Sequence, residues 1–250
     1  MEKLTATAQI VARGDNDFDA EFEWAYVTYE LSDELQISAG KMRVPFYRYS
    51  DFIDVGYAYR WVRPPQSVYS IPFSTYEGLS LLHNTQLGDW DSTVQIMYGS
   101  FDGEIDAITE KTQAELNDFA GINWTLAYDW FSVRAAYLIA ESSFALDGTD
   151  PSGAALNGLE AALRANSLNT LADDIAINED DSSFFGFGFS IDYDNFLFDA
   201  EYTQFEVENS ILTEQTQYYA SVGYRLDAVS YTHLRAHETD SYLVCRLLLE

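Results

Sequence analysis

The sequence is short of basic residues: 13 Lys and Arg stand against 41 Asp and Glu, which gives a formal net charge of −28. Affinity for nucleic acid comes from Lys and Arg on phosphates, so this composition argues against a nucleic-acid partner. The chain is nevertheless 47% hydrophobic and 16% aromatic, whereas disordered acidic chains are poor in aromatic residues. The composition therefore predicts a folded acidic protein.

Cysteine and long apolar runs are also scarce. Cys245 is the one cysteine, so no internal disulfide can form. No apolar run approaches the roughly 18 residues of a membrane helix, but a barrel strand needs only about 9–11 residues with one apolar face. The chain opens directly into an alternating pattern without a signal peptide, which indicates either a cytosolic protein or a reading frame that begins inside a longer gene.

Alternation of apolar and polar residues with a period of two dominates the chain from Leu4 to Leu226. In Phe131–Ala140, for example, Val133 and Tyr137 share one face and Arg134 lies on the other. Such a pattern indicates strands with two different faces. The predicted strands are one that begins at Leu4, then 20–31, 35–44, 77–87, 90–99, 119–128, 131–140, 184–193, 196–207 and 216–226.

The connections between these strands alternate in length. Short turns are expected at 32–34, 88–89, 129–130 and 194–195, and longer loops at 14–19, 45–76, 100–118, 141–182 and 208–215. All long loops would lie at one end of an up-and-down sheet, which is typical of outer-membrane barrels. A soluble β-sandwich has no reason to sort its loops in this way. The sequence thus predicts an all-β, antiparallel, up-and-down transmembrane β-barrel.

The alternation also assigns the two faces of the barrel wall. The residues expected to face lipid are Val94, Ile96, Trp124, Leu126, Val133, Phe187, Phe189 and Val222. Those expected to face the lumen are Gly121, Asn123, Arg134, Gly186 and Asp192. Within the loop 141–182, Pro151 at a first helical position and leucines at helical spacing predict a short helix.

The stretch Lys41–Phe73 is the longest connection with aromatic character, because it contains five Tyr, one Trp and three Phe. Loops longer than about 12–15 residues are uncommon unless they are functional or disordered. We interpret this loop as lying inside, or over the mouth of, the barrel and narrowing a pore, where charged side chains select by charge. The predicted constriction residues are Lys41, Arg43, Arg48, Asp51, Asp54, Arg60 and Arg63. The alternatives are a surface loop with its own aromatic cluster, and arginines that only neutralise neighbouring acids.

Catalytic chemistry has little support. His83 is the only histidine outside residues 229–250, and an outer-membrane barrel enzyme of the lipid-hydrolase type would use it with a serine and an orienting Asn or Asp. A soluble β-sandwich binding module is the second alternative. We expect no enzyme activity, no cofactor and no metal site.

The last residues, Val229–Glu250, lose the alternation and contain two of the three histidines. They resemble translated adapter sequence, and we interpret them as a non-native tail after a barrel region at 1–228. His233, His237 and Cys245 in this tail are therefore not taken as a metal site. Without the tail, residues 1–228 hold 38 acids and 11 bases, a net charge of −27.

Three runs of residues, GKMRVP, DVGYAYRWVRPP and YYASVGYRL, resemble Gram-negative outer-membrane porins of proteobacteria. This resemblance covers roughly residues 1–227. It implies a barrel of about sixteen strands in the outer membrane, usually a homotrimer, through which small hydrophilic solutes and ions diffuse passively. Opening strands and the family's final aromatic-ended strand are missing, so the resemblance implies a partial barrel of about ten strands.

Overall fold

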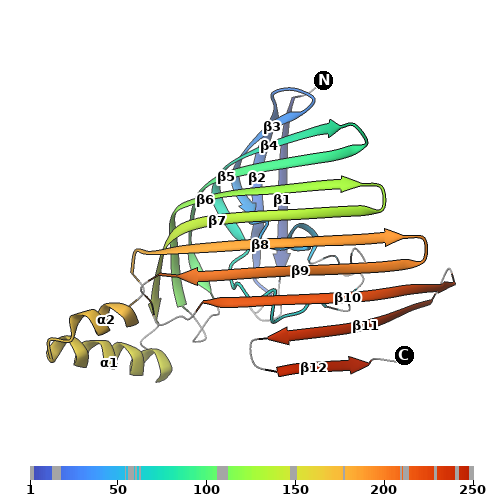
Figure 1. The fold of residues 1–250 in the computed structure, drawn as a ribbon. Helices are drawn as coiled ribbons and strands as arrows, with labels where there is room; N and C mark the ends of the chain where they lie inside the picture. Colours follow the sequence, from blue (N-terminus) through green and yellow to red (C-terminus); the bar gives the residue numbers. More distant parts are fainter. Residues whose placement is uncertain are drawn as a thin grey trace.

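The computed structural model describes residues 3–12, 18–53, 55, 59, 61, 63–105, 112–146, 151–176, 178–208, 210, 214–227, 230–239 and 242–247. Its strands form one twelve-stranded sheet in which each strand pairs antiparallel with its neighbours in sequence (Figure 1). The strands are β1 Leu4–Ala12, β2 Ala20–Glu30, β3 Leu35–Arg43, β4 Thr75–Leu87, β5 Trp90–Ile105, β6 Thr112–Tyr128, β7 Phe131–Leu146, β8 Asp180–Tyr193, β9 Phe196–Val207, β10 Gln215–Asp227, β11 Ser230–Thr239 and β12 Tyr242–Leu247.

The predicted all-β, antiparallel, up-and-down architecture is confirmed. The sheet is strongly curved, and among the described residues no pairing joins β1 to β12, so the sheet is open (Figure 1). Since the described strands all belong to this one sheet, no second sheet packs on either face, as the sandwich alternative would require.

The predicted bounds of the loop 100–118 were wrong, because the strands on both sides of it are longer than predicted. Strands β5 and β6 extend into it and pair as far as Ile105 with Thr112. The alternation continues there, with Ala114 and Leu116 buried and Glu104 and Glu115 exposed. The high density of acids hid this pattern in the sequence, because charged residues on an exposed face are compatible with a strand.

The predicted faces of the wall agree with the structure. Phe187 is 41% exposed, and Ile96, Trp124 and Val222 are exposed with it on the convex face. The remaining residues assigned to lipid lie at the same alternating positions of their strands: Val94, Leu126, Val133 and Phe189.

The residues assigned to the lumen lie at the positions between them. Arg134 is 7% exposed and Asn123 is also buried, while Gly186 lies against the backbone of the loop that follows β3. The remaining two assigned residues, Gly121 and Asp192, occupy the corresponding positions of β6 and β8.

A row of three glycines marks a close approach of neighbouring backbones in the sheet. Gly40 pairs with Gly78, and Gly78 pairs with Gly99, so the row crosses β3, β4 and β5. A Cβ atom on Gly78 would overlap the carbonyl oxygen of Tyr98, and one on Gly99 would overlap that of Glu77. Glycine in a strand is typical of such a close approach, because it has no side chain to keep the backbones apart.

The helical prediction is confirmed by α1 (Pro151–Ala165), which is followed by a second helix, α2 (Asn169–Ile175). The two helices project from the end of the sheet at which β7 finishes and β8 begins (Figure 1). Arg164 joins them, since its guanidinium contacts Glu160 and Asp173, each at 2.9 Å. No helix among the described residues has the length and apolar character needed to cross a membrane.

Part of the tail 229–250 forms strands although its sequence lacks the alternation. Strand β11 pairs with β10 from Gln217 with Thr239 to Asp227 with Ser230, and β12 pairs with β11. Edge pairing uses backbone N–H and C=O groups, so it does not require the alternation that the sequence lacks there. That this tail is non-native stays a prediction from its composition.

The glycine row gives a prediction. Gly78→Ala should lower the free energy of unfolding by about 2 kcal/mol or more, because its Cβ meets backbone atoms that cannot rotate away. Gly158→Ala in α1 is the control, since a Cβ there meets nothing within 4 Å, and alanine favours helix by up to about 1 kcal/mol. Denaturant titration in detergent micelles measures both, and equal stability of the two variants would show that the close backbone approach at Gly78 does not require glycine.

Candidate functional site: a loop packed across the concave face

The loop 44–74 leaves β3 and returns to β4 at almost the same point, because the Val44 amide donates to the Ser74 carbonyl at 2.8 Å. The described residues between these ends include one short 3-10 helix, η2 (Ser50–Phe52). Its apolar side chains belong to the main core of the molecule, in one cluster with residues of β5–β8. A surface loop with its own aromatic cluster would not share this core.

Aromatic rings connect the loop to the wall and to itself. The Phe46 ring meets the Phe184 ring of β8 edge-on, with centroids 5.0 Å apart, and meets Phe73 in the same way at 5.1 Å. The Tyr69 ring packs against the Tyr47 ring at 4.4 Å. Edge-to-face and offset pairs of this kind add stability beyond their buried area.

Polar contacts hold the first part of the loop against β7 and β9. Buried Arg134 of β7 donates to the carbonyl oxygens of Pro45 and Phe46, to the latter at 3.0 Å. The Arg48 amide donates to Glu201 Oε1 of β9 at 2.8 Å, and its guanidinium donates to Ser132 Oγ at 3.0 Å. The distance from Arg48 Nε to Asp199 Oδ1 is 3.8 Å. Four charged side chains, two of each sign, therefore meet here.

The returning part of the loop reaches the same wall. The Tyr69 hydroxyl donates to Glu201 Oε2 at 2.7 Å. Ser70 exchanges a hydrogen bond with Gln217 of β10, and the Trp61 ring meets the Tyr219 ring of β10 edge-on at 5.5 Å.

The root of the loop is fastened separately through Arg43. Its guanidinium donates to the Ser50 carbonyl at 2.8 Å and to Glu23 Oε1 of β2 at 2.9 Å. The guanidinium carbon also lies 4.6 Å from the centre of the Trp24 ring, a cation–π arrangement. Thus the loop is anchored in two separate regions of the sheet, one at β2 and β3 and the other on β7–β10.

The predicted constriction residues occupy different places. Arg43 and Arg48 lie in the two anchor networks described above, and Lys41 donates to the Phe22 carbonyl at 3.1 Å. Asp51 and Arg63 are exposed on the loop. The other two predicted residues, Asp54 and Arg60, lie outside the described residues.

Sequence reasoning placed Arg134 on the lumen face but did not identify Glu201 and Tyr69, which are joined by a hydrogen bond, as part of the site. Asp199 and Glu201 occupy alternating positions of β9 that share a face with buried Leu197 and Thr203. Two acids at inward positions of one strand were a signal that a basic partner lies opposite, because buried charges are paired.

The predicted catalytic candidate, His83, lies on β4 with its side chain 43% exposed, and its Nε2 is 3.9 Å from Glu34 Oε2. Among the described residues, no group of three or more His, Cys, Asp or Glu side chains is arranged to hold a metal ion.

No family model matches the chain, and no curated protein matches it. Solved structures similar to it include outer-membrane expressed OmpT of Vibrio cholerae, at 11% identity and a TM-score of 0.41, covering 94% of this chain and 74% of that one. In-vitro folded OmpT of Vibrio cholerae, an outer membrane protein in a trimer form, has 12% identity and a TM-score of 0.38, covering 95% of this chain and 86% of that one. The CymD monoaromatic hydrocarbon channel has 10% identity and a TM-score of 0.32, covering 93% of this chain and 72% of that one. Scores of this size do not establish a shared fold, so the architecture rests on the strand pairing described above.

Burial of the loop has an electrostatic consequence for its tyrosines. Loss of solvation raises the pKa of the Tyr47, Tyr49 and Tyr69 phenols, and neighbouring carboxylates raise it further: Glu201 for Tyr47 and Tyr69, Asp199 for Tyr49. These phenols are therefore neutral while the loop is in place, and the Tyr69 hydroxyl keeps the proton that it donates to Glu201.

This gives a prediction for alkaline pH. A pKa raised in the folded state contributes stability that is complete below the unfolded pKa of about 10 and is lost as the pH rises above it. We expect the free energy of unfolding to fall above pH ~10, and to fall less steeply in Tyr47→Phe. Exposed Tyr193→Phe is the control, and denaturant titrations from pH 8 to 11 measure all three proteins. If the free energy of unfolding fell equally steeply with pH in Tyr47→Phe and in the parent, the raised pKa of Tyr47 would be contradicted.

Proposed function

We propose that the chain forms the wall and the constriction loop of an outer-membrane pore for the passive diffusion of small hydrophilic solutes and ions. The observation that carries this proposal is the course of loop 44–74, which starts at β3 and is fastened to β7–β10. Strands lie about 4.8 Å apart, so a flat sheet would put β3 and β9 roughly 29 Å from each other. A loop that contacts both crosses the hollow of the curved sheet and narrows it.

The convex face supports a lipid environment. Its exposed side chains in the middle of the sheet are apolar or aromatic, among them Ile122, Tyr137, Ile139 and Phe185. A contiguous apolar face of this kind indicates an interaction with membrane or protein. In the proposed pore this face contacts outer-membrane lipid, and part of it contacts neighbouring subunits of a homotrimer when the barrel is complete.

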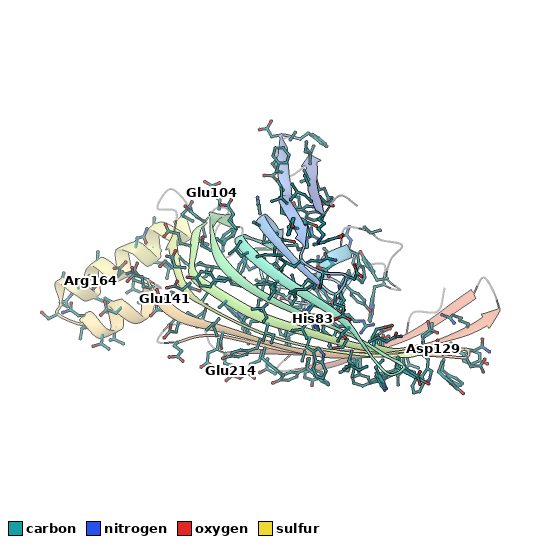
Figure 2. All side chains as sticks on the ribbon, turned by 90° about the horizontal axis from the view of Figure 1, so that it is seen from above. His83, Glu104, Asp129, Glu141, Arg164 and Glu214 are labelled. Atoms are coloured by element: carbon teal, nitrogen blue, oxygen red, sulfur yellow. The ribbon has the colours of Figure 1, made fainter. Side chains whose placement is uncertain are left out.

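The two ends of the sheet differ as they would across a membrane. Aromatic rings gather at the short turns, where Trp90 meets Tyr128 with centroids 5.0 Å apart and Trp130 meets Tyr193 at 5.4 Å. Figure 2 places Asp129 at this end, and Glu104 and Glu141 at the end where the helices project. Aromatic girdles and an acidic outer rim match a barrel with short periplasmic turns and longer external segments.

The charges of the loop support selection by charge. We propose that the seven constriction residues Lys41, Arg43, Arg48, Asp51, Asp54, Arg60 and Arg63 act against a strongly negative background. The net charge of −27 over residues 1–228 gives a negative potential at the mouth, so the pore prefers cations overall. The loop arginines oppose that preference locally.

The lipid-facing assignment has a direct test. Phe187→Arg should reduce insertion into vesicles, because Arg on the lipid face near the midplane costs about 2–4 kcal/mol. Phe187→Leu is the matched control and should insert like the parent. Insertion is measured by vesicle flotation and by heat-modifiable mobility on gels. If Phe187→Arg inserted as well as the parent, lipid contact at this position would be excluded.

The constriction has a separate test in planar bilayers. Replacing Arg48, Arg60 and Arg63 together by Gln should raise the permeability of cations over anions, with a larger change at low salt because screening is then weak. Arg164→Gln, which removes one base from α1 far from the loop, should leave selectivity unchanged. The measurement is the reversal potential across a salt gradient. If the triple variant gives the parental value, the loop does not lie in the conduction path.

A further inference from the structure

We infer that Glu201 is the positioning residue that clasps both arms of loop 44–74 to the wall and thereby sets the width of the pore, an inference that rests on the proposed function. Glu201 is only 3% exposed, and each of its carboxylate oxygens accepts a hydrogen bond from the loop. Oε1 accepts from the Arg48 amide on the outgoing arm, and Oε2 accepts from the Tyr69 hydroxyl on the returning arm. One side chain of β9 thus joins two loop segments 21 residues apart.

The strand beside Glu201 is shaped to receive the loop. A Cβ on Gly186 would lie 3.2 Å from the Phe46 carbonyl oxygen, closer than side chains ordinarily approach. The absence of a side chain at Gly186 of β8 therefore lets the outgoing arm lie directly on the sheet.

Charge balance makes the clasp dependent on its partners. A buried carboxylate persists when opposite charge and hydrogen bonds compensate for lost water. Arg134 holds the outgoing arm by its carbonyl oxygens, and Arg48 approaches Asp199, so two arginines face the two carboxylates of β9. Removal of Glu201 leaves the Arg48 amide and the Tyr69 hydroxyl without their acceptor, whereas the root contact of Arg43 with Glu23 is untouched.

The clasp is distinct from general support of the sheet. Both hydrogen bonds join Glu201 to the loop and not to a neighbouring strand, so their loss should free both arms without opening the ladder between β8, β9 and β10. The readout that separates these cases is backbone hydrogen exchange, followed by mass spectrometry on the full chain in detergent micelles.

In Glu201→Ala we expect exchange to become ~10-fold faster or more in segments 44–53 and 65–74, with the strands unchanged. Glu201→Gln keeps one acceptor oxygen and should give an intermediate increase. Glu206→Gln makes the same charge change at an exposed position of β9 and should exchange like the parent. Unchanged exchange in both arms of Glu201→Ala, or equal acceleration throughout the sheet, would overturn the inference.

Tyr69→Phe keeps the test decisive if Glu201→Ala fails to fold. It removes one bond of the returning arm, so acceleration should be confined mainly to 65–74, and no acceleration would overturn the clasp. Single-channel recording of Glu201→Gln then connects the clasp to the pore, with fluctuating current levels expected. Faster exchange with a steady parental current would overturn the assignment of Glu201 to pore width. Absence of current from the parent chain would instead overturn the proposed function.

Discussion

The packing of loop 44–74 into the hollow of a curved sheet is the constraint on which the other features depend. The loop supplies about a third of the buried core, and Val44, Phe46 and Val68 have almost no contact with solvent. Without it, the concave faces of β5–β8 would leave apolar side chains such as Leu138 and Phe184 exposed. The curved sheet and the loop therefore stabilise each other, because each buries the apolar surface of the other.

Close approach of backbones in turn depends on glycine at particular positions. The glycine row across β3, β4 and β5 lets these strands approach closely near the start of the loop, and Gly186 admits the loop backbone at the opposite wall. Between these points the loop brings Arg48 to Asp199 and Glu201. Two of the 13 basic residues of the chain, Arg43 and Arg48, therefore serve to hold the loop in place.

Much of the fold could be predicted because alternation is a local signal. The strand 196–207 was predicted with its final bounds, and the inward position of Arg134 follows from its place between Val133 and Ala135. Alternation failed where many acids occupied one face, as in β5 and β6, and where pairing at a free edge needs no pattern, as in β11. The clasp was not predictable, because Arg48 and Tyr69 are 153 and 132 residues from Glu201 and leave no local trace of the contact.

The central claim, that the loop crosses the concave face, can be tested by cross-linking. Ser70 of the loop and Gln217 of β10 exchange a hydrogen bond, so cysteines at these positions should be joined by a short bifunctional thiol cross-linker in a chain whose Cys245 is replaced by Ser. Cysteines at Thr28 and Ser38, whose hydroxyls are 2.8 Å apart on neighbouring strands, provide the positive control. Both pairs should be cross-linked in the folded protein if the loop crosses the concave face. Cross-linking of the control pair alone would show that the loop lies elsewhere.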